Sequence, residues 1–292
     1  MNSFTGIYFP DNPQHPAIEV LRNMTRKQNF QLLEEPNLVI QCQQHTETAS
    51  NNEWLVVTDA AFYNKEEMAS RWGLPAASLQ QLPAAEFILQ GLSKKGVSFT
   101  DGLVGDFAIV AYHQPTDTLY CFRDQHGFRP LYYYRQNGLF FFSNQLTKLS
   151  SLPGVDQTPD MEFVVDTLAG IKSDKERTSC QHIFRLLPAH FMKIQDNHTE
   201  LKRYWDFDLS KEIHYTREED YVEAFRELLQ ESIACRLEGD QVGAELSGGL
   251  DSSVIAAVAA GLLSQEGRSL QTFSHAHPPE KDTADVFPKD EK

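Results

Sequence analysis

The sequence predicts two domains of different classes: a layered α+β domain over residues 1–207, and the first part of a parallel-sheet α/β domain over residues 208–292. Three observations lead to this prediction. Short apolar or alternating runs separated by turn residues fill the first part of the chain, which is typical of strands. An Asn-Gly pair joins two of these runs, and Asn-Gly is the strongest short signal for a hairpin. Later, a strand pattern, a glycine turn, an apolar helix and a second strand follow one another, as in a βαβ unit.

The first strands are predicted from runs rich in β-branched and aromatic residues. They cover residues 38–41, 54–57, 107–112 and 118–122. The last two runs are separated by His113–Asp117, where Pro and Asp favour a hairpin connection.

A second hairpin is predicted where residues 131–135 and 139–143 flank Gln136-Asn137-Gly138. Amphipathic helices are expected at residues 84–92 and 161–168, and further strands at 184–187 and 191–194. Antiparallel strands with a few helices pack as layers around a shared core, so we expect a layered α+β domain up to about residue 207.

The second domain is predicted to follow a linker at residues 208–215. Thr216-Arg-Glu-Glu219 has the pattern of a capping box and predicts the start of a helix that ends before Gly239. A strand at 242–246, a helix at 252–263 and a strand at 270–274 then form the βαβ unit. Residues 278–292 are charged, contain Pro and predict a loose tail.

Composition limits the function classes. With 26 Lys and Arg against 41 Asp and Glu, the net charge of −15 disfavours nucleic acid and anionic membranes as partners. The four Cys form no Cys-x-x-Cys pair, so free thiols in a reducing, cytoplasmic compartment are expected. The start of the chain lacks the features of a signal peptide, and no apolar run approaches the roughly 20 residues that span a bilayer.

The turn after the predicted strand at 242–246 has the features of a pyrophosphate site. Gly248 and Gly249 let backbone N–H groups converge with no Cβ in the way, and the helix start adds a partial positive charge. Serines at 247, 252 and 253 offer hydroxyl donors, and Asp251 offers a carboxylate for Mg²⁺. An ordinary strand–turn–helix connection uses the same residue types, but the full run Ser-Gly-Gly-Leu-Asp-Ser-Ser favours nucleotide binding.

This heptapeptide resembles the PP-loop of the ATP pyrophosphatase domain in the asparagine synthetase family. Further motifs of that family stand upstream, in the family's order: Gly105–Ala108, Arg123–Tyr133, Gly138–Ser143, Leu187–His190 and Tyr204-Trp205. The resemblance implies an N-terminal-nucleophile-type, glutaminase-like first domain and an adenine nucleotide α-hydrolase-like second domain, with ATP and Mg²⁺ as cofactors.

The resemblance also implies which residues bind ATP and its pyrophosphate: Leu246, Ser247, Gly248, Gly249, Asp251, Ser252 and His275. Asp251 would reach Mg²⁺ beside the phosphates. The alternative for Asp251 is a capping role at the start of the helix.

The first domain departs from the family where glutamine chemistry is performed. The family uses an N-terminal Cys whose own amino group is the base. Here Thr5 stands in that position behind four residues, so its nitrogen is an amide without a basic lone pair. Asp59-Ala60-Ala61 replaces the family's glutamine-binding Asn-Gly-Glu. We therefore expect a glutaminase fold without glutaminase chemistry, with Thr5 as an ordinary residue of an edge strand.

The family's reaction is ATP-dependent amide-bond formation through an acyl-adenylate. The resemblance implies a carboxylate substrate such as aspartate, and the altered first domain implies ammonia as the nitrogen source. Two alternatives stay open: a PP-loop ligase that closes a macrolactam or β-lactam ring, and a non-catalytic remnant that binds a partner.

The family's second domain continues for about 200 residues beyond its second strand, the size of a full α/β domain. The 292 residues therefore predict a truncated synthetase domain that is inactive by itself. Its sheet would lack cover, which predicts a homodimer or aggregation. The helix residues expected to stay partly exposed are Val254, Ile255, Val258, Leu262 and Leu263.

Overall fold

The computed structural model describes residues 2–10, 14–24, 29–75, 82–171, 174–196 and 198–275. The chain divides into two compact units, Met1–Asp208 and Leu209–Lys292, and each is described by itself. The tail predicted at residues 278–292 lies outside the described residues.

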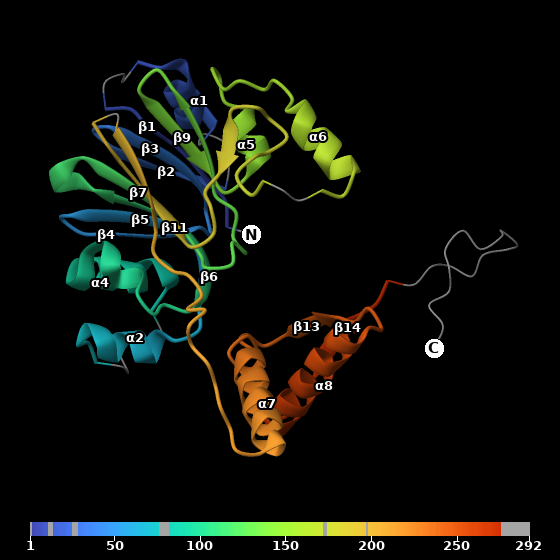
Figure 1. Cartoon of the computed structure of the whole chain (residues 1–292). Coiled ribbons are helices and arrows are strands. Elements are labelled where there is room, and N and C mark those ends of the chain that lie inside the picture. Colours follow the sequence, from blue (N-terminus) through green and yellow to red (C-terminus); the bar gives the residue numbers. More distant parts are fainter. Residues whose placement is uncertain are drawn as a thin grey trace, which may run out of the picture. The chain divides into compact units, whose positions relative to one another are not determined.

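Two six-stranded antiparallel sheets form the centre of the first unit (Figure 1). Sheet I has the order β10 (Ile183–Arg185), β8 (Tyr132–Gln136), β9 (Leu139–Ser143), β1 (Phe4–Tyr8), β3 (Leu38–Gln43) and β2 (Phe30–Glu35). Sheet II has the order β12 (His198–Arg203), β11 (His190–Gln195), β7 (Thr118–Arg123), β6 (Gly105–His113), β5 (Trp54–Phe62) and β4 (Glu47–Ser50).

Helices cover the outer face of each sheet. On sheet I lie α1 (Pro16–Met24) and α5 (Leu146–Ser150), and on sheet II lie α2 (Lys65–Trp72) and α4 (Ala84–Lys95). The short 3₁₀ helices are η1 (Gly96–Thr100) and η2 (Gln114–Thr116). Helix α6 (Met161–Leu168) has no fully buried residue.

Three apolar clusters hold these layers together. Successive strand residues point to opposite faces of a sheet, so one strand can contribute side chains to a cluster on each face. Between the sheets, Phe4 and Tyr8 of β1 pack in one cluster with Val57 of β5. Ile7 of the same β1 strand points the other way, into the cluster under α1 and α5. The third cluster joins sheet II to α2 and α4. The helix–sheet–sheet–helix order confirms the predicted layered α+β domain.

The predicted hairpins are present. β8 and β9 pair antiparallel, and Asn137 and Gly138 between them both have positive φ, at 49° and 78°. This is the conformation for which Asn-Gly is favoured in two-residue hairpin loops. β6 and β7 also pair antiparallel, and η2 forms their connection.

The prediction that Thr5 lies in an edge strand is wrong. β1 lies between β9 and β3, and Thr5 is opposite Ser143 on one side and Gln41 on the other. All five residues of β1 are buried. The short sequence Phe-Thr-Gly-Ile-Tyr gives no local sign of this position, because partners that are distant in the chain create it.

The second unit contains the predicted βαβ arrangement. β13 (Val242–Glu245) and β14 (Leu270–Phe273) pair in parallel, and α8 (Leu250–Gln265) connects them. They follow α7 (Glu218–Ala234). On α8, Val254 and Ile255 are 36% and 46% exposed, as predicted, whereas Leu263 is fully buried, so the prediction for Leu263 is wrong.

The predicted capping box of α7 is also wrong. The N-cap is Arg217, not Thr216, and it makes no side-chain cap hydrogen bond. The helix ends at Ala234, before the predicted stop at Gly239. Within the described part of the chain, none of the helices has both the length and the apolar character needed to cross a membrane.

Candidate functional sites

Thr5, predicted to occupy the nucleophile position, is held inside sheet I. Its side chain is 2% exposed, and its Oγ1 lies 2.9 Å from the Oγ of Ser143. The Ser143 hydroxyl donates to the carbonyl oxygen of Phe4 at 2.8 Å, so the Thr5 hydroxyl is the donor to Ser143. The Thr5 hydroxyl is therefore committed to a buried hydrogen-bond chain.

The Thr5 side chain also faces away from the second sheet. Thr5 and Ile7 share one face of β1, and Ile7 packs in the cluster under α1 and α5. Asp59 shares a face of β5 with Leu55 and Val57, which pack between the sheets. Strand alternation therefore places the Thr5 side chain on the outer face of sheet I and the Asp59 side chain between the two sheets.

Polar side chains between the sheets lie beside Asp59, the residue predicted to stand where the family has its glutamine-binding Asn. Asp59 is 5% exposed, and its Oδ2 lies 3.7 Å from Nη1 of Arg129. Burial raises the pKa of the Asp59 carboxyl, and the charge of Arg129 and a hydrogen bond from Asn144 oppose this shift. Asn144 also accepts from the Phe4 amide at 3.0 Å and donates to the Asn2 carbonyl at 2.6 Å.

Sequence reasoning did not identify Ser143, Asn144 or Arg129 as members of this region. Ser143 and Arg129 stand inside motifs of the family resemblance. Membership of those motifs was the available sign that Ser143 and Arg129 matter. Their positions in the sequence do not show that Ser143 contacts Thr5 or that Arg129 lies near Asp59.

Arg123 and Asp124 form the centre of the longest of these motifs. Asp124 is 1% exposed and accepts backbone N–H bonds at 2.9–3.4 Å. The donors are Phe107, His126, Phe128 and Arg129. Arg123 donates in turn to three backbone carbonyls, those of Gly127, Arg129 and Leu186, at 2.6–2.9 Å. Both side chains therefore fix the loop that follows them.

The structure brings the other motifs to the same place. The Asp124 carbonyl accepts from the Ala189 amide at 2.9 Å, and the Tyr204 hydroxyl donates to the Arg123 carbonyl at 2.6 Å. Gly127 has a φ of 73°, and a Cβ there would meet the Arg123 guanidinium and Pro188 at 2.9 Å. These motif residues thus act as structural supports in this chain.

The predicted pyrophosphate loop joins the end of β13 to α8. Gly248 has a φ of 85°, and no atom lies within 4 Å of the place where its Cβ would be. The Ser247 and Ser252 hydroxyl oxygens lie 2.9 Å apart, and Ser253 donates to the Gly249 carbonyl at 2.8 Å. The loop residues are exposed or half-buried, and the Ser247 and Gly249 amides bond hydroxyls of the loop itself, so a ligand can reach the loop from solvent.

Helix α8 starts directly at this loop. Its N-cap is Gly249, which makes no side-chain cap hydrogen bond, and Asp251 is in the first turn. A carboxylate in the first turn also suits the helix dipole, so the helix-terminal role of Asp251 stays open beside the Mg²⁺ role. Free N–H groups at such a helix start suit an anion.

Leu246 and His275 lie on the two strand ends beside the loop. The Leu246 amide donates to the Phe273 carbonyl at 2.8 Å, and the Ser274 hydroxyl donates to the Leu246 carbonyl at 2.8 Å. His275 is exposed next to Ser274. The seven residues predicted to bind ATP thus lie at or next to the carboxyl ends of β13 and β14.

Among the described residues, no three His, Cys, Asp or Glu side chains gather as a metal site. Mg²⁺ beside Asp251 would accordingly need phosphate oxygens and water as its other ligands, which is the usual preference of this ion. The donor set fits a metal that arrives with a nucleotide.

Comparison with known protein families gives two matches. A glutamine amidotransferase domain matches residues 39–205, more than half of the chain, and an asparagine synthase domain matches residues 224–287. The chain belongs to the family of the glutamine-hydrolysing asparagine synthetases. The order of its two domains is the order predicted from the motifs.

The individual proteins that the chain resembles are distant relatives. Asparagine synthetase [glutamine-hydrolyzing] 3 of Bacillus subtilis is 26% identical over 233 residues, which are 78% of this chain and 37% of the relative. Amidase chyE of Penicillium rubens is 31% identical over 221 residues, 74% of this chain and 31% of the relative. The chain thus spans about a third of the length of the curated relatives it matches.

Among solved structures, a glutamine phosphoribosylpyrophosphate amidotransferase of Bacillus subtilis, complexed with ADP and GMP, has a TM-score of 0.42 and 13% identity to this chain. The match covers 92% of this chain and 65% of that protein.

Proposed function

We propose that this chain contributes to ATP-dependent amide-bond formation of the asparagine synthetase type, in which a carboxylate is activated as an acyl-adenylate. The observation that carries the proposal is the open Ser247–Ser253 loop between a parallel strand and the uncapped start of α8. Converging N–H groups, hydroxyls and Mg²⁺ at such a loop would stabilise a departing pyrophosphate. The asparagine synthase match over residues 224–287 supports it.

In this proposal each loop residue has a role. Gly248 and Gly249 present backbone N–H groups, Ser247 and Ser252 present hydroxyls, and Asp251 holds Mg²⁺ against the phosphates. Leu246 and His275 border the adenosine. We propose aspartate as the carboxylate substrate. We propose the cytoplasm as the location of the protein.

Ammonia, or an amine of the substrate, is proposed as the nitrogen donor. The support is the state of Thr5, whose hydroxyl is buried and committed to Ser143 and whose nitrogen is in a peptide bond. Incubation with glutamine should release no glutamate above a buffer blank. Glutamate release that disappears in Thr5→Ala would contradict this part of the proposal.

Calorimetry with Mg-ATP tests the loop directly. We expect weak binding by the 292-residue chain, on the order of millimolar or about 4 kcal/mol, and its loss in Asp251→Asn. Glu266→Gln is the matched control, because it removes a carboxylate from just beyond the far end of the same helix. Unchanged affinity in Asp251→Asn, or equal loss in both variants, would refute the role of Asp251.

The overall reaction is tested with the protein at its full cellular length. Mg-ATP, aspartate and ammonia should yield asparagine and pyrophosphate. A second candidate is a ring-closing ligase, because two relatives with 31% and 29% identity carry the name amidase rather than asparagine synthetase. Pyrophosphate formed only with a peptide or a β-amino acid substrate would favour that candidate, and no pyrophosphate with any of them would favour a binding remnant.

A further inference from the structure

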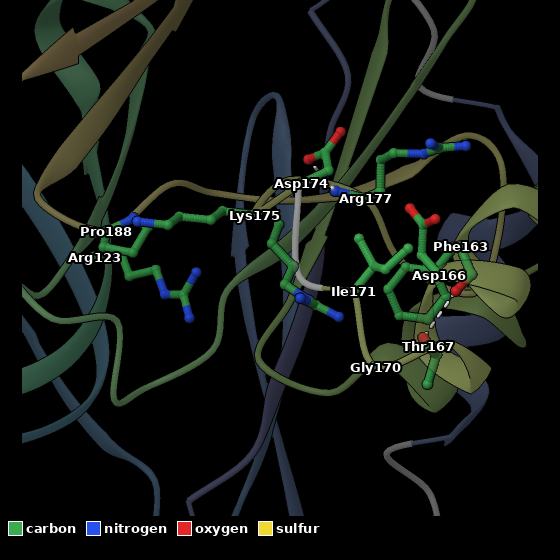
Figure 2. A pocket seen from close by; sticks show the side chains of 11 residues that line it. Arg123, Phe163, Asp166, Thr167, Gly170, Ile171, Asp174, Lys175, Arg177 and Pro188 are labelled. Carbon is green, nitrogen blue, oxygen red and sulfur yellow. Dashed lines mark hydrogen bonds between the residues drawn. The ribbon is translucent and has the colours of Figure 1, made fainter.

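Side chains that bond main-chain carbonyls hold several loops of this chain in place. In the first unit, Arg123 lies with Pro188 at one side of a cavity of about 450 Å³ beside α6 (Figure 2). Its guanidinium is bonded to three backbone carbonyls, so Arg123 fixes the chain around it. A side-chain donor on one carbonyl restrains a whole peptide group, because that group is planar.

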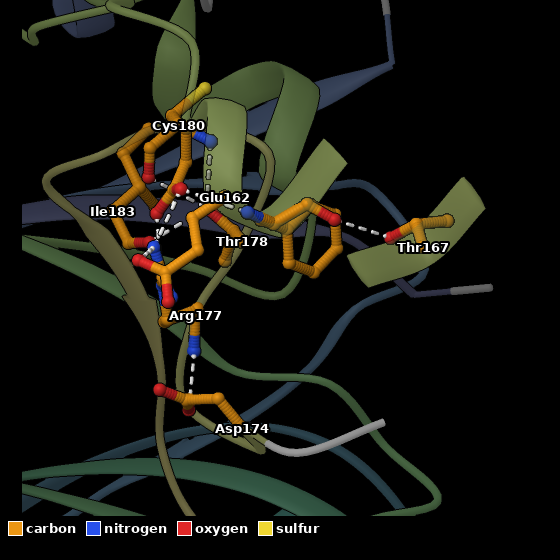
Figure 3. A network of polar contacts seen from close by, with 9 residues as sticks. Glu162, Thr167, Asp174, Arg177, Thr178, Cys180 and Ile183 are labelled. Atoms are coloured by element: carbon orange, nitrogen blue, oxygen red, sulfur yellow. Dashed lines mark hydrogen bonds and ion pairs between the residues drawn. The ribbon is translucent and has the colours of Figure 1, made fainter. Parts of the chain in front are cut away.

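Thr178 is a second example of such a bond (Figure 3). Its side chain is fully buried, and its hydroxyl donates to the Ile183 carbonyl at 2.7 Å. The same hydroxyl oxygen accepts the Cys180 amide at 3.2 Å. One hydroxyl thus ties together the short turn that leads into β10.

The same kind of bond occurs at the nucleotide loop of the second unit. The parallel ladder of β13 and β14 ends at the pair Glu245 and Phe273. One residue further, the Leu246 amide donates to the Phe273 carbonyl at 2.8 Å, and the Ser274 hydroxyl donates to the Leu246 carbonyl at 2.8 Å. The Ser274 side chain therefore holds the last peptide group before the Ser247–Ser253 loop.

The far side of that peptide group carries the Ser247 amide. Because the group is planar and trans, the Leu246 carbonyl and the Ser247 N–H point in opposite directions in one shared plane. The Ser247 amide donates at 3.3 Å to the hydroxyl oxygen of Ser252, the third residue of α8. A chain of hydrogen bonds thus runs from the end of β14, through one peptide group, into the first turn of the helix.

Ser247 is also linked to the rest of the loop. Its hydroxyl oxygen lies 2.9 Å from that of Ser252 and accepts the Gly249 amide at 3.4 Å. Rotation of the Leu246–Ser247 peptide would therefore displace hydroxyls and amides that are proposed to face the pyrophosphate. The direction of these donors depends on a residue outside the loop.

We propose that Ser274 is a positioning residue for the nucleotide loop. Its hydroxyl sets the plane of the Leu246–Ser247 peptide, and through it the direction of the Ser247 amide and hydroxyl, without touching the pyrophosphate. The proposal rests on the pyrophosphate-binding function proposed above for the Ser247–Ser253 loop. Donors that are already oriented bind a ligand more tightly, because less ordering is needed on binding.

NMR titration of the 292-residue chain with magnesium pyrophosphate and, separately, with adenosine tests the role of Ser274. Ser274→Ala should weaken pyrophosphate binding about three- to tenfold, the net contribution of a typical hydrogen bond, and leave adenosine binding unchanged. Ser274→Thr keeps the hydroxyl and should bind pyrophosphate like the unaltered chain. Ser269→Ala is the matched control, because Ser269 is an exposed serine at the amino end of β14, whereas the loop lies at the carboxyl end.

Exchange of the Ser247 amide proton with water, followed by NMR, is the second measurement. It should be at least threefold faster in Ser274→Ala, while amides in the middle of α8 exchange at the rate of the unaltered chain. An unchanged rate at Ser247 would overturn the proposal. Faster exchange throughout α8 would show a general loss of structure instead and would overturn it as well.

The titrations separate this inference from the function on which it rests. If the unaltered chain binds no magnesium pyrophosphate, the function proposed for the loop is wrong, and the role of Ser274 falls with it. If the unaltered chain and Ser274→Ala bind pyrophosphate equally well, only the role of Ser274 is wrong. Loss of adenosine binding with unchanged pyrophosphate binding would identify Ser274 as a contact of the nucleoside, which also overturns the proposal.

Discussion

At the scale of single residues, Arg123 and Asp124 are sequence neighbours of opposite charge, and each is satisfied by the main chain. The Arg123 guanidinium donates to three backbone carbonyls, and the Asp124 carboxylate accepts from four backbone N–H groups. Burial lowers the pKa of the Arg123 guanidinium, with the neighbouring Asp124 charge opposing the shift. The family motif is thereby explained as a folding element, since it arranges a loop without exposing its charges.

Asp124→Asn should lower the free energy of unfolding of the first unit by about 2–4 kcal/mol. An amide keeps one acceptor oxygen where the carboxylate has two, so buried N–H donors are left without a partner. Urea unfolding followed by fluorescence measures the loss. Asp101→Asn, at an exposed position, is the control, and an equal effect of both changes would contradict this account.

Asp59 predicts a dependence of stability on pH. Burial raises its pKa above the ordinary value of 3.8, so ionisation costs more in the folded than in the unfolded protein. The contribution of protonated Asp59 is complete below pH 3.8 and is lost as the pH rises through the higher folded pKa. Asp59→Asn should therefore stabilise the chain more at pH 7 than at pH 4, as measured by denaturant unfolding at both pH values. An equal effect at both would show that the Asp59 pKa is unperturbed.

At the scale of elements, local patterns predicted local structure. The Asn137-Gly138 hairpin and the Ser247–Ser253 turn were predicted because their geometry depends on residues within the turn. The central place of β1 was missed because Thr5 meets Ser143 only in the folded chain. The pattern Thr216-Arg-Glu-Glu219 predicted a capping box, yet Arg217 occupies the N-cap position.

Replacement of two glycines by Ala should change the free energy of unfolding in opposite directions. Gly138→Ala should destabilise the first unit by about 1–2 kcal/mol, because Ala is strained at a φ of 78°. Gly261→Ala should stabilise α8 by about 0.5–1 kcal/mol, because Gly261 is helical and no atom within 4 Å would meet its Cβ. Thermal unfolding of the two variants gives the signs, and the same sign for both would refute the argument.

At the scale of the whole molecule, the two units are joined by an open segment. Residues 204–217, all of which are described, form neither helix nor strand, and most of their side chains are exposed. Such backbone is a preferred site of protease attack. Limited proteolysis should cut first between residues 206 and 216 and leave a fragment that ends near Asp208. Equal survival of this segment and of the sheets would contradict the division into two units.

The second unit exposes one apolar helix face. Tyr221, Val222, Phe225 and Leu228 of α7 are between 43% and 68% exposed. Apolar surface of this kind favours association. Sedimentation should show self-association of the 292-residue chain, a homodimer among the outcomes, that falls in Phe225→Glu. Val104→Glu, in the first unit, is the control for added charge at an exposed apolar site. A monomer at all concentrations would refute the expectation.

The central place of β1 has a consequence for the time at which the chain can fold. Thr5 leaves the ribosome before Ser143, its hydrogen-bond partner, which is made 138 residues later. At roughly 5–20 residues per second, this separation corresponds to about 7–28 s of synthesis. During that interval Phe4, Ile7 and Tyr8 have one side of their strand without its neighbour, so sheet I is completed only when β9 emerges. Loss of nascent chains to proteases or aggregation should therefore concentrate in ribosome-bound chains in which β1 has left the exit tunnel and β9 has not.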